Sequence, residues 1–325
     1  MNEKRRREYT EKYIRTGKDV IVPKGDNPYP QMKADSFRLD VTHDFGGYGG
    51  SVLWASIFEP VNMQPEPAVS EQPRHITVIG GGPLDFTKLH GEAVVTIGRN
   101  KDDKSTFTLT EPFSVYVEKG MLYSINITKV NPGCPVRYSE LIVGDGAPVT
   151  DAQASGGVGY EKYIKTGGDI VANYPDKDNL PCPVMTISNP MFGSKELIRR
   201  TWMPITKPHV MAKNSHTHAF EEFLVCYGSD PDNISDLGGV IEFTIGEDED
   251  SLETFRIDKA VQFYVKDGLW HCPLVFKEVY DENKPMIFCE VSYAAVLAQD
   301  KALDNFIVEE DPSDRLKWVM PDDKK

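Results

Sequence analysis

The sequence predicts an all-β protein made of two copies of one barrel-like unit. Short runs rich in β-branched and aromatic residues, separated by turn signals, are typical of a sandwich or a small barrel. The chain also repeats itself over a long stretch, which indicates a duplicated domain. Its 325 residues are enough for two domains that each bury a core of their own.

The strand-like runs occur in the same order in both halves. The first half contains ITVIG, EAVVTIG, STFTLT and FSVYVEKG, at 76–80, 92–98, 105–110 and 113–120. The second half contains FLVCYG, GVIEFTIG, ETFRID and VQFYVKDG, at 223–228, 239–246, 253–258 and 261–268. A few short helices are expected, at the start of each half over 5–16 and 160–166, and in the tail around Ala302.

The internal repeat has a short part and a long part. EKYIRTGKDVIV at 11–22 resembles EKYIKTGGDIVA at 161–172. Residues 74–129 align with 222–277 without a gap, and 14 of the 56 positions are identical. Several identities are glycines between strand-like runs, which indicates that the backbone follows the same path twice.

The repeat sets the expected domain boundaries. We expect an N-terminal domain over residues 1–150 and a C-terminal domain over 158–325. The stretch GDGAPVTDAQASGGVG, at 144–159, is rich in Gly, Ala and Ser and is typical of a linker.

Composition and charge exclude several classes of protein. The formal net charge is -14, from 50 acidic and 36 basic side chains, so a nucleic-acid partner is not expected.

Five cysteines without C-x-x-C spacing favour reduced thiols in the cytoplasm. The charged N-terminus lacks the apolar core of a signal peptide, and no run is apolar enough for a membrane partner.

Four residues of the second half have the pattern of a metal site. His216 and His218 are two apart, so on one strand their side chains point to the same side. Glu222 keeps that parity, and His271 lies on a later strand that a barrel could bring alongside. Three imidazoles and one carboxylate suit one divalent transition metal, which could be Fe, Mn, Ni, Co, Cu or Zn, with positions left for substrate or water.

These residues resemble the two sequence motifs of the cupin superfamily, H-x-H-x(3,4)-E-x(6)-G and P-G-x-x-H. They appear here as HTHAFEEFLVCYG and DGLWH. The resemblance covers both halves and implies a bicupin of two double-sheet jelly-roll barrels. It also implies that His216, His218, Glu222 and His271 are the metal ligands.

The sequence departs from the cupin motifs in two places. Asp267 stands where the second motif has proline, and Glu222 lies one residue too close to Gly228. Glu221 would satisfy that spacing but shortens the gap after His218. We favour Glu222 on strand parity and keep Glu221 as the alternative.

The first half lacks a complete ligand set. In the ungapped alignment Ala68, Ser70, Arg74 and Tyr123 stand at the four ligand positions. A guanidinium only donates hydrogen bonds and carries a positive charge, so it cannot hold a cation. We expect no metal in this half, with Arg74 and Tyr123 supporting the structure.

Two arginines, Arg199 and Arg200, precede the metal motif on one strand. Only one of them can face inward, where it would suit a substrate carboxylate. The default expectation is that both are exposed.

The resemblance implies a metal-dependent enzyme that acts on a small organic substrate, and a dioxygenase is favoured. Isomerase, lyase or decarboxylase chemistry without O2 is the second hypothesis, and a non-catalytic protein that binds a metal or small ligand is the third. A small-molecule substrate is the expected partner, and a homo-oligomer is possible.

Overall fold

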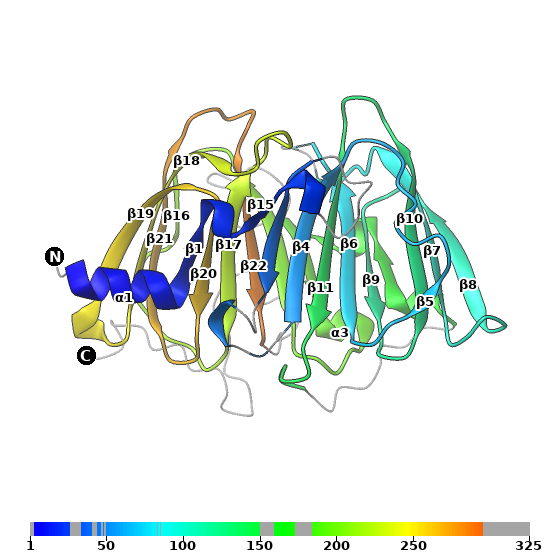
Figure 1. The fold of residues 1–325 in the computed structure, drawn as a ribbon, viewed down its shortest axis with the longest axis horizontal. Coiled ribbons are helices and arrows are strands. Elements are labelled where there is room, and N and C mark those ends of the chain that lie inside the picture. Colours follow the sequence, from blue (N-terminus) through cyan, green and yellow to red (C-terminus); the bar gives the residue numbers. More distant parts are fainter. Residues whose placement is uncertain are drawn as a thin grey trace. The chain divides into compact units, whose positions relative to one another are not determined.

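The computed structural model describes residues 3–26, 34–40, 44–46, 48, 50–82, 84, 86–149, 159–172 and 184–294. They fall into two compact units. The C-terminal unit holds 3–20 and 198–294, and the N-terminal unit holds the described residues from 21 to 172 together with 185–197. Figure 1 shows that arrows dominate the described chain, as expected for an all-β protein. The tail around Ala302 and most of the predicted linker lie outside the described residues.

The C-terminal unit consists of one helix, two sheets and short 3-10 turns. Its elements are α1 (Glu3–Tyr13), β1 (Ile14–Thr16), η1 (Gly17–Asp19), β15 (Arg199–Ile205), β16 (His209–Ala212), β17 (Glu222–Gly228), β18 (Asp236–Gly246), η5 (Glu249–Ser251), β19 (Glu253–Lys259), β20 (Val261–Val265), β21 (Trp270–Val279) and β22 (Met286–Ser292). Within this unit the strands of one sheet follow the order β1-β20-β17-β22-β15, in a sheet that continues to β14 (Val184–Ser188) and β13 (Val171–Ala172), and the other sheet has the order β16-β21-β18-β19.

The N-terminal unit repeats this plan. Its elements are β2 (Ile21–Val22), η2 (Lys24–Asp26), β3 (Ser36–Asp40), β4 (Gly50–Ile57), β5 (Ala68–Val69), β6 (Arg74–Gly80), β7 (Gly91–Gly98), β8 (Lys104–Leu109), β9 (Phe113–Val117), β10 (Leu122–Val130), β11 (Val136–Val143), η3 (Glu161–Tyr163), β12 (Ile164–Thr166), η4 (Gly167–Asp169), β13 (Val171–Ala172), β14 (Val184–Ser188) and α3 (Asn189–Phe192). Its sheets have the orders β12-β9-β6-β11-β4-β3-β2 and β5-β10-β7-β8.

The core of the C-terminal unit lies between its two sheets. The Phe243 ring of β18 lies 4.5 Å from the Phe263 ring of β20, and Phe276 of β21 lies 5.7 Å from Phe288 of β22. All four side chains are almost fully buried. The sheets therefore close on each other through aromatic contacts, as in a jelly roll.

The two copies of the short repeat have the same local structure but belong to opposite units. β1 pairs with β20 of the C-terminal unit, and β12 pairs with β9 of the N-terminal unit. The compact units therefore differ from the expected boundaries 1–150 and 158–325, because each half contributes its first strand to the sheet that the other half forms. The helix expected over 160–166 is also wrong, since this stretch forms a 3-10 turn and then strand β12.

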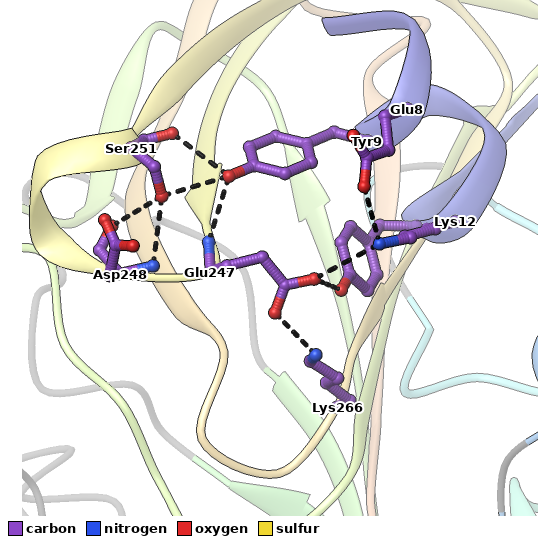
Figure 2. A network of polar contacts seen from close by, with 8 residues as sticks. Glu8, Tyr9, Lys12, Glu247, Asp248, Ser251 and Lys266 are labelled. Carbon is purple, nitrogen blue, oxygen red and sulfur yellow. Dashed lines mark hydrogen bonds and ion pairs between the residues drawn. The ribbon is translucent and has the colours of Figure 1, made fainter. Parts of the chain in front are cut away.

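Helix α1 is attached to the C-terminal unit by polar contacts (Figure 2). The Tyr9 hydroxyl donates to Ser251 Oγ at 3.0 Å and accepts from the Glu247 amide at 3.1 Å. Tyr13 donates its hydroxyl to the Glu247 carboxylate, to which Lys266 also donates at 2.6 Å. Both tyrosines are buried, so α1 is fixed to this unit by its aromatic side and by the Glu247 carboxylate, and Arg5 and Arg6 also pair with Glu253 at 3.9 and 3.8 Å.

Among the residues described, none of the helices combines the length and the apolar character needed to cross a membrane.

Candidate metal centre

Three chain segments bring the predicted ligands together in the C-terminal unit. His216 and His271 form an isolated β-bridge, in which each amide donates to the other residue's carbonyl at 3.0 Å. The Gly268 amide donates to the His218 carbonyl at 2.9 Å. Glu222 is the first residue of β17 and pairs with both neighbouring strands. The backbone ladder therefore fixes the positions of all four predicted ligands.

Backbone carbonyls set the protonation of the three imidazoles. The Nδ1 atoms of His216, His218 and His271 lie 3.0, 2.8 and 2.9 Å from carbonyl oxygens two residues away. A carbonyl oxygen only accepts, so each Nδ1 carries the proton and donates. Each Nε2 therefore keeps its lone pair, as a metal-binding histidine requires.

The lone pairs of this cluster face one another. Glu222 Oε2 lies 3.5 Å from His218 Nε2 and 3.9 Å from His271 Nε2. Donor atoms of these three residues lie within 4.8 Å of one another. Lone pairs packed this closely repel unless a cation lies between them, so the donor set fits a divalent transition metal.

The charge state of the cluster suits a cation. Burial lowers the pKa of His216 to about 4 and holds the pKa of His271 well below its ordinary value. Burial alone would raise the pKa of Glu222, but positive charge placed beside its carboxylate outweighs burial, and the pKa is about 2. At neutral pH, His216 and His271 are neutral and Glu222 is ionised.

The two adjacent glutamates point in different directions. Glu222 faces His218, whereas Glu221 accepts a hydrogen bond from the Tyr264 hydroxyl at 2.9 Å. The preference for Glu222 agrees with this geometry, but the reason given for it was wrong. Residues 217–221 are not strand, so side-chain alternation does not continue from His218 to Glu222.

A buried polar chain supports Glu222 from behind. The Ser292 hydroxyl lies 3.2 Å from Glu222 Oε1 and 2.5 Å from Glu290 Oε1. Arg199 pairs with Glu290 and also contacts Ser292 Oγ at 3.4 Å. Arg199 is therefore connected to the candidate ligand Glu222 through Ser292.

The expectation that both arginines are exposed was wrong. The Arg199 side chain is 17% exposed, and Arg200 is completely buried. They lie on opposite faces of β15, because Arg199 contacts Glu290 while the Arg200 guanidinium lies 4.6 Å over the Trp202 ring. Only Arg199 lies near Glu222, as the alternation of a strand requires.

One residue of the cluster, Cys272, was not expected from the sequence. Its sulfur and donor atoms of His216 and His271 lie within 4.8 Å of one another. Burial raises the pKa of the Cys272 thiol well above its ordinary value. The only sequence signal was its place next to His271, and regular alternation would have turned it away from the cluster.

Neither a protein-family model nor a curated protein sequence matches the chain. Solved structures do match it. A Bacillus subtilis oxalate decarboxylase structure, concerned with the Mn(II) centres of that enzyme, has a TM-score of 0.50 and 14% identity, covering 87% of this chain and 79% of that chain. A structure on the substrate binding mode of oxalate decarboxylase has the same four values. A serine-to-alanine mutant of the Bacillus subtilis enzyme has a TM-score of 0.50, 15% identity and the same coverage.

The match extends over more of the chain than either compact unit supplies, so both units take part in it. The chain has the bicupin fold. The C-terminal unit is one barrel of this bicupin and the N-terminal unit is the other. At this identity the comparison concerns the fold, and the chemistry of the site rests on this chain's own residues.

The register of the N-terminal barrel confirms the ungapped alignment. Tyr123 pairs with Ala68, as His271 pairs with His216 in the other barrel of the bicupin. The Gly120 amide donates to the Ser70 carbonyl at 2.8 Å, which repeats the contact from Gly268 to His218. The backbone frame of the metal centre is thus present twice.

Side chains of a different kind fill this second frame. Arg74 pairs with Glu140 at 2.5 Å, donates from its Nε to the Ser70 hydroxyl oxygen at 2.9 Å, and lies 5.5 Å over the Tyr123 ring. The N-terminal barrel thus holds an internal ion pair at the position where the other barrel places Glu222. Within the described residues, both potential metal clusters belong to the C-terminal barrel.

Proposed function

We propose that the C-terminal barrel binds one divalent transition metal through His216, His218, Glu222 and His271. The observation that carries the proposal is the contact of each Nδ1 with a backbone carbonyl oxygen. This contact places the proton on Nδ1 and leaves Nε2 as the metal-binding atom of each ring. A bound metal would act as a Lewis acid toward the substrate.

The surroundings favour an anionic substrate. Glu222 is the one carboxylate among the four proposed ligands, so it balances only part of the charge of a divalent cation. Behind it, Arg199 and Glu290 pair with each other. A small carboxylate would complete the charge balance of such a centre.

Apolar side chains limit the access of water to the cluster. The Phe220 ring stacks on His218 at 3.7 Å, and the Phe243 ring lies 6.4 Å from His271. Both phenylalanines are buried. Charges interact more strongly where water is excluded, so these rings favour tight binding of an anion to the metal centre.

We propose that the protein is an enzyme and that its reaction is the decarboxylation or a related lyase reaction of a small carboxylate. The sequence favoured a dioxygenase, with lyase chemistry as the alternative. The likeness to oxalate decarboxylase over both barrels supports the alternative, and no observation on the described residues favours the dioxygenase.

The proposal is tested by measuring CO2 release and O2 uptake together. The metal-loaded protein is incubated with a panel of small carboxylates, with oxalate as the first member. We expect CO2 release without matching O2 uptake, and loss of the activity in Glu222→Gln but not in Glu221→Gln. O2 uptake in proportion to substrate would instead make the protein a dioxygenase. Metal binding without turnover of any member would make it a binding protein.

A further inference from the structure

Cys272 faces the metal centre because strand β21 contains a bulge. In the pairing of β18 with β21, Ile245 lies opposite His271 and Phe243 lies opposite Leu274. Between these two pairs, one residue of β18, Thr244, lies opposite two residues of β21, Cys272 and Pro273. Bulges of this kind redirect side chains beside functional sites.

The bulge occurs at this position in the C-terminal barrel but not at the equivalent position in the N-terminal barrel. In the N-terminal barrel Tyr123, Ser124 and Ile125 pair with consecutive residues of β7 without a shift. Cys272 adopts a φ of 73°, in the left-handed region that side chains other than glycine rarely enter. A strained backbone at this one position points to a function for the redirected side chain.

The redirected thiol creates a second donor set. His218, Glu222 and His271 form one set of three, and His216, His271 and Cys272 form another. His271 belongs to both, and all members of the second set are buried. The first set contains a carboxylate, which hard cations prefer, and the second contains a sulfur, which soft cations prefer.

We propose that Cys272 is a metal ligand and that, with His216 and His271, it gives the centre a second, thiophilic coordination mode. The inference rests on the proposed metal site and adds to it a role for a residue outside the cupin motifs. Soft cations such as Cd(II) bind through the thiolate set, and harder cations such as Mn(II) bind through Glu222 and the three histidines of the proposed site. Ligation forms a bond from sulfur to the metal and releases the thiol proton to solvent.

The test compares Cd(II) and Mn(II) binding to the metal-free full-length protein. With Cd(II) we expect an ultraviolet charge-transfer band from thiolate to metal. Cys272→Ser should abolish this band and weaken Cd(II) binding by more than the roughly 10- to 100-fold that loss of a supporting residue costs, while Mn(II) affinity stays nearly unchanged. Glu222→Gln should weaken Mn(II) binding more than Cd(II) binding.

Two other cysteines provide matched controls. Cys226 is buried in β17, and Cys134 is partly exposed in the N-terminal barrel. Cys226→Ser and Cys134→Ser should both keep the charge-transfer band.

Three results would overturn the inference. The first is a Cd(II) complex without the band, and the second is a band that survives in Cys272→Ser. The third is loss of Mn(II) and Cd(II) together in both Cys272→Ser and Cys272→Ala, which would make the residue structural. Failure of the proposed metal site is distinct, because the wild-type protein would then bind no Mn(II).

Discussion

The three histidines of the candidate centre are oriented by backbone groups. Asn214, Phe220 and Leu269 each provide a carbonyl oxygen to one imidazole. A carbonyl is present whichever side chain the residue carries, so the tautomers depend on the path of the chain and not on the identity of these neighbours. The carboxylate is different, because it is supported by the side chain of Ser292.

The first residue-scale prediction concerns the ligand carboxylate. Glu222→Gln should reduce metal affinity by more than the roughly 10- to 100-fold cost of losing a supporting residue, because it removes the only carboxylate among the proposed ligands. Glu221→Gln should leave metal content nearly unchanged, since its carboxylate bonds to Tyr264. Elemental analysis of both variants decides the matter. The opposite pattern would assign the ligand to Glu221.

The second residue-scale prediction concerns the support of that carboxylate. Ser292→Ala removes the hydroxyl that contacts both Glu222 and Glu290. Two buried carboxylates then lose their shared partner, and metal affinity should fall by roughly 10- to 100-fold. Ser114→Ala, at a buried serine of the N-terminal barrel, is the control and should not change the affinity measured by titration. Equal affinities for the two variants would remove Ser292 from the centre.

The sequence predicted residues that the structure brings close to one another, because histidine and glutamate at motif spacing carry a signal that does not depend on the exact backbone. His218, Glu222 and His271 have donor atoms within 4.8 Å of one another, and His216 forms a bridge with His271. The sequence was not sufficient to predict Cys272, which faces the centre through a bulge and a left-handed φ. Neither feature has a pattern in the sequence. The polar chain from Arg199 to Ser292 was missed for a related reason, since it joins strands whose pairing only the fold defines.

At the scale of elements, α1 illustrates how a repeat can mislead. The two copies of the short repeat have nearly the same sequence, and both form a strand followed by a 3-10 turn. A helix precedes the first copy, where Glu3–Tyr13 forms α1, and only a short 3-10 turn precedes the second. Extending one helix prediction to both copies was therefore wrong, although the strands that follow them are equivalent.

The element-scale prediction concerns the pH dependence of α1. Burial alone would raise the pKa of Glu247, but hydrogen bonds from Lys266 and Tyr13 outweigh it and hold the pKa below the ordinary 4.5. A carboxyl group with a lowered pKa in the folded state contributes stability above its unfolded pKa and loses it as the pH falls through the folded value. Attachment of α1 should therefore weaken below about pH 4.5.

Hydrogen exchange of the α1 amides, compared at neutral and acidic pH, measures this effect. Glu247→Gln is the matched variant, since it keeps the shape and removes the titrating charge (Figure 2). We expect a smaller pH dependence of α1 exchange in the variant than in the wild-type protein. The same pH dependence in both would show that Glu247 does not control the attachment.

At the scale of the whole molecule, the bicupin fold contains one site with the proposed metal ligands and one equivalent site with an ion pair. The same backbone contacts occur in both sites. They include the bridge between His216 and His271 and the hydrogen bond from the Gly268 amide to the His218 carbonyl. Duplication of the fold thus leaves each barrel free to differ in chemistry. The alignment of the two halves predicted that different residues stand at the four positions, because such a difference can be seen in the residue identities without the structure.

The whole-molecule prediction concerns metal content and stability. We expect about one metal per chain, and metal removal should lower the stability of the C-terminal barrel, because a ligand that binds only the folded state stabilises it. The N-terminal barrel should unfold at the same temperature with and without metal. Calorimetry with and without chelator, together with elemental analysis, checks both points. Two equivalents of metal, retained when His216 and His218 are both replaced by alanine, would contradict the assignment.

During synthesis, strand β1, which completes the C-terminal barrel, leaves the ribosome before the strands that receive it. Tyr9 and Ser251, which hydrogen-bond to each other, are 242 residues apart in the chain. The N-terminal barrel likewise cannot be completed until β12, which pairs with β9 and follows residue 150, has been synthesised. A chain cut at its linker would yield two fragments that each lack an edge strand and carry the strand of the other. An unpaired edge strand can pair with a strand from another chain. The two fragments should therefore bind each other, because each carries the strand that the other lacks. In the intact chain both strands are already present.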